Sequence, residues 1–407
     1  MIPLISLASN LWNRPFLLDT PSSTTTTTTT ISSSTTTTTS SSSSTGTGSA
    51  MVVDSERSNI GHQVVEALRT SGFLLIQSDL LSQELQQQAL QDATTWLTTS
   101  SRNDDHDDHH NANKEDTERD MVIHHPTDPK IYVMLENKHI QAETQAETEI
   151  QPQQQQQQLK QQCYLTPNLR QYWQVCEQLK LCVLRAIAVG LQLPNPELLA
   201  EWHSRGQHSA MRLLHYPTTA STATKNSGNR CKAHSDYGTV TLLSTDGVSG
   251  LEIYVNGKWW PVPHRPGTVV VNIGSLLSEW TANTTTTDNR IDNRNSKMQQ
   301  PPALSPPPLP LLATLHRVAG PASEQSATDP KVLQEASTQP RTSIAFFVDP
   351  DNDTPLTGTG NTTTAPSIED YLQYRSGGNS EYVERSGVAF TEMEQDLMDR
   401  HQSQLQP

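Results

Sequence analysis

Aromatic and apolar side chains are scarce in this sequence. Of its 407 residues, 33% are hydrophobic and 5% are aromatic, which is little for a chain that is packed throughout its length. The deficit is uneven, because Thr, Ser, Gln, Asn and Pro gather in separate runs, whereas the segments between these runs have ordinary core composition. We therefore expect one globular domain that is interrupted by disordered insertions, rather than two domains.

Basic residues are outnumbered, and cysteines are few. Lys and Arg total 28 against 43 Asp and Glu, which gives a formal net charge of −15 and argues against a protein that binds nucleic acid through phosphate contacts. The four cysteines include no Cys-x-x-Cys pair, and a chain of this length does not need covalent cross-links. We expect reduced thiols in a reducing compartment.

Long apolar runs are missing as well, so the sequence predicts no membrane-spanning segment. Residues 1–7 lack the basic segment of a secretory signal, and their apolar stretch is short. We expect a cytoplasmic protein. An organellar transit peptide stays open as an alternative, because Ser and Thr abound and acidic residues are scarce near the start, although Arg is rare there too.

Composition and patterning divide the chain into four parts. We expect a helical and mixed N-terminal region, a Ser/Thr-rich disordered insertion, a β-rich core that is itself interrupted, and a C-terminal loop and helix. In the same order, their bounds are 1–20 with 51–200, then 21–50, then 201–355 with disordered insertions near 282–310 and 321–340, and finally 356–407.

The periodicity of apolar residues predicts helices before about residue 200 and short strands after it. Helices are expected at roughly 82–98 and 168–192, and a shorter one from Ile60 to Gly72. Strands are expected near 73–76, 210–216, 238–244, 251–255, 268–273, 313–318 and 342–348. Many short strands at close spacing favour a mainly β fold with flanking helices, arranged as an antiparallel sandwich or barrel.

The triplet His234-Ser235-Asp236, with His316 far downstream, is the sharpest chemical signal. On a strand, residues i and i+2 project to the same face, so His234 and Asp236 would point together. Two imidazoles and one carboxylate suit Fe(II) and leave positions open for oxygen and a co-substrate, whereas structural zinc favours cysteines. A surface His and Asp in a turn is the alternative for the triplet alone.

A basic anchor follows the metal motif. Arg341 and Ser343 share one face of a predicted strand, where a guanidinium and a hydroxyl are suited to hold a carboxylate. Tyr216 alternates with Leu214 and Arg212, so its phenol could reach the same place. The alternatives are a surface arginine before a buried strand and a tyrosine that only packs.

These residues resemble the isopenicillin N synthase-like branch of the Fe(II)/2-oxoglutarate-dependent dioxygenases. The resemblance implies a double-stranded β-helix (jelly roll), Fe(II) bound by His234, Asp236 and His316, and 2-oxoglutarate held by Arg341, Ser343 and Tyr216. It also implies decarboxylation of 2-oxoglutarate to succinate and CO2, with O2 consumed and a small organic molecule hydroxylated or desaturated. The matching stretches are 2–5, 72–76, 212–217, 234–243, 250–253, 259–274, 315–318 and 341–350.

Two rival hypotheses remain at the level of the sequence. One is an iron oxidase on the same scaffold that dispenses with 2-oxoglutarate. The other is a catalytically silent jelly roll whose polar tracts recruit protein partners. The His- and Asp-rich run at 104–110 is interpreted as a solvated tract, and the series Asp349, Asp351 and Asp353 lacks the Gly and the closing Glu of a calcium-binding loop.

Overall fold

The computed structural model describes the parts of the chain with ordinary core composition. The sequence predictions for 21–46, 104–110, 142–162 and 284–309, and nearly all of those for 356–407, fall outside the described residues. The described residues are 2–12, 47–100, 123–125, 128–141, 165–218, 229–283, 310–321 and 323–354, with Ile368 and Leu372.

Within these ranges the strands form two sheets. The larger has eight strands in the order β1-β2-β10-β7-β12-β5-β4-β3, and the smaller has four in the order β6-β11-β8-β9. Apart from the parallel pair β1 and β2, the pairing is antiparallel. The strands are β1 (Leu4–Ser6), β2 (Phe73–Gln77), β3 (Ile123–His124), β4 (Ile131–Glu136), β5 (Ala210–Tyr216), β6 (Asn229–His234), β7 (Val240–Thr245), β8 (Leu251–Val255), β9 (Lys258–Pro261), β10 (Val269–Ile273), β11 (His316–Ala319) and β12 (Arg341–Val348).

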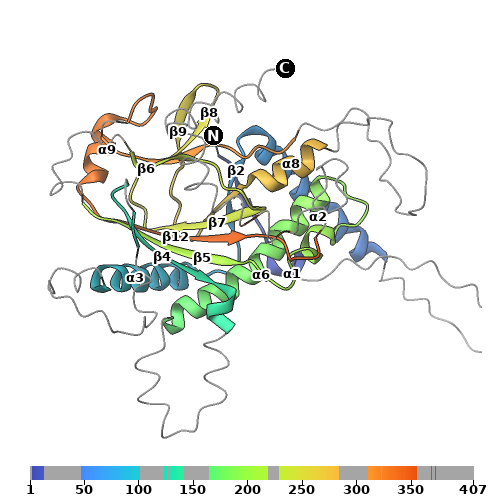
Figure 1. The fold of residues 1–407 in the computed structure, drawn as a ribbon. Coiled ribbons are helices and arrows are strands. Elements are labelled where there is room, and N and C mark those ends of the chain that lie inside the picture. Colours follow the sequence, from blue (N-terminus) through green and yellow to red (C-terminus); the bar gives the residue numbers. More distant parts are fainter. Residues whose placement is uncertain are drawn as a thin grey trace, which may run out of the picture.

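Helices cover one face of the large sheet, with α3 and α6 running beneath β12, β5 and β4 (Figure 1). Helix α6 is long and well capped. Its N-cap residue Thr166 accepts the backbone N–H of Leu169 at 3.2 Å through its hydroxyl, and Pro167 lies in the first turn. None of the described helices has the length and apolar character needed to cross a bilayer. The helices are α1 (Ser9–Trp12), α2 (Thr47–Thr70), α3 (Gln83–Ser100), α6 (Pro167–Gly190), α7 (Leu198–Glu201), α8 (Ser275–Asn283) and α9 (Pro330–Ser337).

Strand β12 shows how the large sheet divides its side chains between two faces. Ile344, Phe346 and Val348 belong to the core that the helices cover, and Trp173 of α6 meets Phe346 edge to face at 5.0 Å between ring centroids. Because side chains alternate along a strand, the odd-numbered residues from Arg341 to Phe347 point the other way, toward the small sheet. We call this second side the inner face.

The small sheet packs against the inner face through two apolar clusters. In one, Leu214 and Ala345 of the large sheet contact Cys231 of β6 and Val318 of β11. In the other, β2 and β10 of the large sheet meet β8 of the small one. Side chains on the inner face and on the facing strands β6 and β11 therefore line the same space between the sheets.

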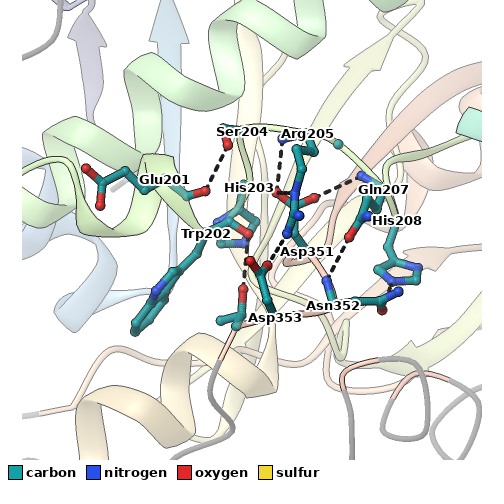
Figure 2. Close-up of polar contacts among 12 residues, drawn as sticks. Glu201, Trp202, His203, Ser204, Arg205, Gln207, His208, Asp351, Asn352 and Asp353 are labelled. Carbon is teal, nitrogen blue, oxygen red and sulfur yellow. Dashed lines mark hydrogen bonds and ion pairs between the residues drawn. The ribbon is translucent and has the colours of Figure 1, made fainter.

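A buried carboxylate fastens the segment before β5 to the segment after β12. The side chain of Asp351 is fully buried and accepts the backbone N–H groups of Arg205 and Gln207, each at 3.0 Å (Figure 2). The Asp353 carboxylate pairs with the Arg205 guanidinium in the same network. The aspartates that follow β12 thus hold a loop, and within the described residues they form no metal-binding cluster.

His203, next to this loop, is buried with both ring nitrogens in contact with the protein. One ring nitrogen contacts the Leu199 carbonyl oxygen at 2.6 Å and the other contacts the Thr239 hydroxyl at 2.8 Å. Burial lowers the pKa of His203 from 6.5 to about 4, because a charged imidazole would lose its hydration. The imidazole is thus neutral in the folded protein at pH values where the unfolded chain binds a proton.

We therefore expect the His203→Gln variant to be less sensitive to acid than the wild type. Above about pH 6.5 the imidazole is neutral in both states, whereas between about 6.5 and 4 only the unfolded state is protonated. This linkage should cost the wild type about 3 kcal/mol of unfolding free energy by pH 4. Urea unfolding of both proteins at pH 7 and pH 4.5 measures the difference, and equal pH dependence would contradict the expectation.

Helix α8 and the start of the segment before β11 are tied to each other. The Ser278 hydroxyl donates to the Leu311 carbonyl oxygen at 2.7 Å, and the Leu311 N–H donates to the Thr281 hydroxyl at 3.1 Å. The Leu312 N–H donates to the Leu68 carbonyl oxygen at 3.2 Å and so fixes the same segment to the end of α2. The chain therefore enters β11 from a fixed position.

Several sequence predictions need correction. Residues 321–340, predicted to be a disordered insertion, contain α9, whose first turn is capped by Asp329 accepting the Lys331 N–H at 2.8 Å. An Asp-Pro pair starts this helix, although the stretch as a whole is polar. Helix α2 begins at Thr47, before the expected Ile60 and inside the end of the predicted 21–50 insertion. Strand β6 and helix α8 were not predicted. The bounds of the domains stay a prediction.

Candidate metal centre

The structure brings His234, Asp236 and His316 together at the edge of the inter-sheet space. His234 is the last residue of β6 and His316 is the first residue of β11, and the two are direct partners across these antiparallel strands. Asp236 lies two residues beyond β6, outside the strand. The alternation argument from the sequence is thus wrong for Asp236, because other contacts turn its carboxylate toward the two imidazoles.

Those contacts come from two residues whose role the sequence did not reveal. The Thr241 hydroxyl and the Asn272 amide donate to Oδ2 of Asp236 at 2.6 and 2.7 Å. Because Oδ2 accepts both bonds, the other oxygen, Oδ1, faces the histidines. A polar Asn within the otherwise apolar strand Val269–Ile273 was the available signal for such a role.

The donor atoms converge. Oδ1 of Asp236 lies 3.9 Å from Nε2 of His234 and 3.8 Å from Nε2 of His316, and each of the three residues offers a ligand atom within 4.8 Å of the others. At bond lengths of about 2.1 Å, two ligand atoms of one metal lie about 3 to 4 Å apart. The set therefore fits a single ion that binds nitrogen and oxygen.

Each imidazole is held in the tautomer that a metal requires. Nδ1 of His234 lies 2.9 Å from the Lys232 carbonyl oxygen, and Nδ1 of His316 lies 3.2 Å from the Thr314 carbonyl oxygen. A carbonyl oxygen can only accept, so Nδ1 carries the proton in both rings and Nε2 keeps its lone pair. The ring of Phe73 meets His316 edge to face at 5.5 Å and supports its orientation.

Electrostatics favour the deprotonated donors. The inward side of the His234 ring is desolvated although the side chain is about half exposed, and this desolvation, with the neighbouring His316, lowers the pKa of His234. Burial alone would raise the pKa of Asp236. The two histidines and the hydrogen bonds from Thr241 and Asn272 lower it on balance. A neutral imidazole and an ionised carboxylate are the forms that bind a cation.

Access to this group is one-sided. The side chains of Asp236 and His316 are 10% and 11% exposed, whereas that of His234 is 47% exposed. The three donors occupy one side of a prospective ion, and no fourth His, Cys, Asp or Glu joins them among the described residues. This arrangement suits a catalytic ion with open positions and differs from a closed structural zinc site.

The structure also brings Arg341, Ser343 and Tyr216 together on the inner face. Arg341 and Tyr216 are register partners on β12 and β5, and the guanidinium carbon lies 5.2 Å from the centre of the phenol ring. The Arg341 guanidinium is buried and donates to the Ser343 hydroxyl at 3.2 Å. Burial raises the pKa of Tyr216, so its phenol stays protonated and able to donate. These groups can grip a carboxylate.

Residues 207–300 match the family model of the 2OG-Fe(II) oxygenase superfamily. The match includes His234 and Asp236 and ends before His316 and Arg341. The chain carries a 2OG-Fe(II) oxygenase domain. The predicted resemblance is thereby confirmed at the level of the superfamily, whose members use Fe(II), 2-oxoglutarate and O2.

Fungal relatives of the oxygenase domain have names of the same kind. The chain is 35% identical over 117 residues to the 2-oxoglutarate-Fe(II) type oxidoreductase ppzD of Metarhizium majus. The aligned region covers 28% of this chain and 33% of that protein. It is 37% identical over 134 residues to the 2-oxoglutarate-dependent dioxygenase htyE of Aspergillus rugulosus, covering 32% and 38%. These matches span less than two-fifths of the length of either relative.

The fold of the oxygenase domain is shared with a solved structure. A full-length protein of Neurospora crassa, in complex with alpha-KG and 5-formyluracil, superposes with a TM-score of 0.51 at 18% identity, over 79% of this chain and 90% of that chain. Two facing sheets with flanking helices correspond to its jelly-roll core, which confirms the predicted fold class.

Proposed function

We propose that the protein is an Fe(II)- and 2-oxoglutarate-dependent oxygenase that hydroxylates or desaturates a small organic molecule. The observation that carries the proposal is the convergence of His234, Asp236 and His316 beside an open side of the site. The buried anchor of Arg341 and Ser343 lies on the inner face that the same inter-sheet space adjoins. The cytoplasm is the compartment that we propose for it.

The residues of the chain prepare the site for this chemistry. His234 and His316 present Nε2, and Asp236 presents Oδ1, so together they would hold the ferrous ion on one side. The Arg341 guanidinium would bind the distal carboxylate of 2-oxoglutarate, with Ser343 and Tyr216 beside it. When bound, iron and 2-oxoglutarate supply the oxidising power, and O2, 2-oxoglutarate and substrate yield succinate, CO2 and hydroxylated product.

Two other functions were open from the sequence, and the geometry favours neither. A silent jelly roll has no need of two histidines held in one tautomer around an oriented carboxylate. An oxidase without 2-oxoglutarate could use the buried Arg341 guanidinium for a carboxylate of its substrate, so consumption of 2-oxoglutarate decides between these two functions.

Spectroscopic and turnover measurements on the purified protein test the function. Anaerobic Fe(II) and 2-oxoglutarate should together produce a visible charge-transfer absorption. Addition of air and a metabolite extract should then release succinate in step with product. Oxygen uptake without consumption of 2-oxoglutarate would replace the proposal by the oxidase, and absence of Fe(II) uptake would replace it by the silent jelly roll.

The partners of Asp236 give a subtler test. In the Asn272→Ala variant Oδ2 loses its amide donor, so the carboxylate is free to turn and Fe(II) affinity should fall about 10- to 100-fold. Anaerobic titration with Fe(II) measures the loss. The matched control is the Asn352→Ala variant. Asn352 is exposed and contacts His208, which is not one of the proposed metal ligands. The Fe(II) affinity of this variant should equal that of the wild type. Equal affinity in both variants would contradict the role of Asn272.

A further inference from the structure

Arg212 on β5 has a buried donor with no acceptor. Its Nε is shielded from solvent and has no hydrogen-bond partner among the described residues, and no ion pair with a carboxylate is found for it there. A buried polar group that stays unpaired costs roughly 1 to 3 kcal/mol, and more when it is charged. A group of this kind calls for a partner that arrives from outside the chain.

The strand register places Arg212 on the inner face. On β5 it alternates with Leu214 and Tyr216, which contact the small sheet, so its side chain leaves the same side of the sheet. Its partner on β12 is Ala345, two residues from Ser343 in one direction and two from Phe347 in the other.

This position lies between the two halves of the proposed active site. On one side along β12 are Arg341 and Ser343, the proposed grip for 2-oxoglutarate. On the other side, Phe347 is the register partner of Thr241, whose hydroxyl donates to Asp236. A molecule that contacts Arg212 from the inter-sheet space would therefore lie between the co-substrate anchor and the row of residues that supports the metal ligands.

Two aromatic rings hold the guanidinium. Its central carbon lies 5.0 Å from the centre of the Tyr132 ring and 5.2 Å from the centre of the Phe347 ring. Cation–π contacts of this kind fix the position of the cation and use the ring faces, but they satisfy no N–H group. The buried Nε–H stays without an acceptor, although the Arg212 side chain as a whole is partly exposed.

The surrounding charge is positive. Burial lowers the pKa of His125, and the nearby positive charges of Lys130, Lys232 and Arg212 lower it further. The one carboxylate that acts in the opposite direction on His125, that of Asp128, accepts a hydrogen bond from Lys130 at 2.9 Å. The region around Arg212 thus favours an anion and disfavours the charged form of the neighbouring His125.

We propose that Arg212 binds a carboxylate of the substrate, so that the substrate is a small organic acid whose apolar part lies against Tyr132 and Phe347. The inference rests on the proposed function and names the substrate class for the same site. A planar carboxylate fits two parallel N–H groups on one edge of a guanidinium, which matches the unpaired Nε. The carboxylate of 2-oxoglutarate does not fill this role, because Arg341 and Ser343 form a separate anchor.

The experiment compares acids with their neutral counterparts. The probes are a panel of aromatic and aliphatic monocarboxylic acids, each paired with its primary amide. Binding is followed by the thermal shift of the metal-free protein, and turnover by succinate release with Fe(II) and 2-oxoglutarate. We expect one or more acids to bind and to stimulate succinate release, and their amides to do so about 10- to 100-fold less well.

Variants then assign the effect to Arg212. Arg212→Gln should lose the preference for acid over amide, and Arg212→Lys should keep part of it, because an ammonium retains the charge without the fork of donors. Both variants should keep the charge-transfer absorption with Fe(II) and 2-oxoglutarate. Arg265→Gln, which changes an exposed arginine, is the matched control and should behave as the wild type. The melting temperature of Arg212→Gln without ligand measures the loss of the two cation–π contacts separately from any loss of ligand binding.

Each contrary outcome overturns the inference. The contrary outcomes are equal binding of the acids and their amides, an Arg212→Gln variant that still prefers acids over amides, and no binding by any acid of the panel. Failure of the proposed function is a separate result. If the wild type gives no charge-transfer absorption, there is no oxygenase, whereas the thermal shifts of the metal-free protein still report whether Arg212 binds carboxylates.

Discussion

The Asp236→Ala variant is expected to lose Fe(II) binding and at least a thousandfold of any Fe(II)-dependent turnover. The substitution removes the anionic ligand of the proposed set, and the two neutral imidazoles that remain hold a divalent ion poorly. It also leaves the Thr241 hydroxyl and the Asn272 amide without their acceptor, which should lower the unfolding free energy by about 1 to 3 kcal/mol.

The companion variant His234→Ala separates binding from stability. His234 is about half exposed, so its removal should eliminate Fe(II) binding with little change in melting temperature. His208→Ala is the matched control, because this partly exposed histidine contacts Asn352 and takes no part in the convergent group. Anaerobic Fe(II) titration and thermal unfolding measure both effects. Retained turnover in His234→Ala or Asp236→Ala would refute the metal assignment.

The second large effect is expected in the Arg341→Ala variant, which should need about 100-fold more 2-oxoglutarate. The guanidinium is buried, so a carboxylate brought beside it exchanges hydration for charge-assisted hydrogen bonds worth about 3 kcal/mol. Without it the carboxylate would lose its charged hydrogen-bond donor and keep the neutral Ser343 hydroxyl. Fe(II) affinity should not change, because Arg341 contacts none of the three proposed ligands.

Ser343→Ala provides the graded comparison. It removes one neutral hydroxyl from the same anchor, so the requirement for 2-oxoglutarate should rise only about tenfold. Succinate release against 2-oxoglutarate concentration measures both variants. An Arg341→Ala protein that saturates at the wild-type concentration would show that the co-substrate is held elsewhere.

Strand positions were the part of the fold that the sequence predicted best. β5 and β8 agree with the expected bounds, and β10 and β12 begin within one residue of them. Apolar and β-branched residues dominate these strands or recur along them, so the residues themselves indicate that they form strands. The edge strand β6 was not predicted, because its sequence, Asn-Arg-Cys-Lys-Ala-His, carries no apolar pattern. Its position is set by pairing with β11 rather than by local preference.

The chemical residues were predictable for a different reason. His234, Asp236 and His316 stood out by type and by family-like context, and the structure brings them together. Their supports did not stand out, since Thr241 and Asn272 become partners of Asp236 only when β7 and β10 pair side by side. Arg212 was visible only as a member of an alternating strand. Its missing partner can be recognised only once burial is known.

The tie between α8 and Leu311 bears on how this protein tolerates change in length. Because Ser278 and Thr281 on one side of 284–309 are hydrogen-bonded to Leu311 on the other, a longer interval between positions 283 and 310 should leave His316 opposite His234. Doubling such a connection costs only about 0.6 kcal/mol of closure entropy. The segment between positions 283 and 310 can therefore vary in length and sequence during evolution without a compensating change among the proposed metal ligands.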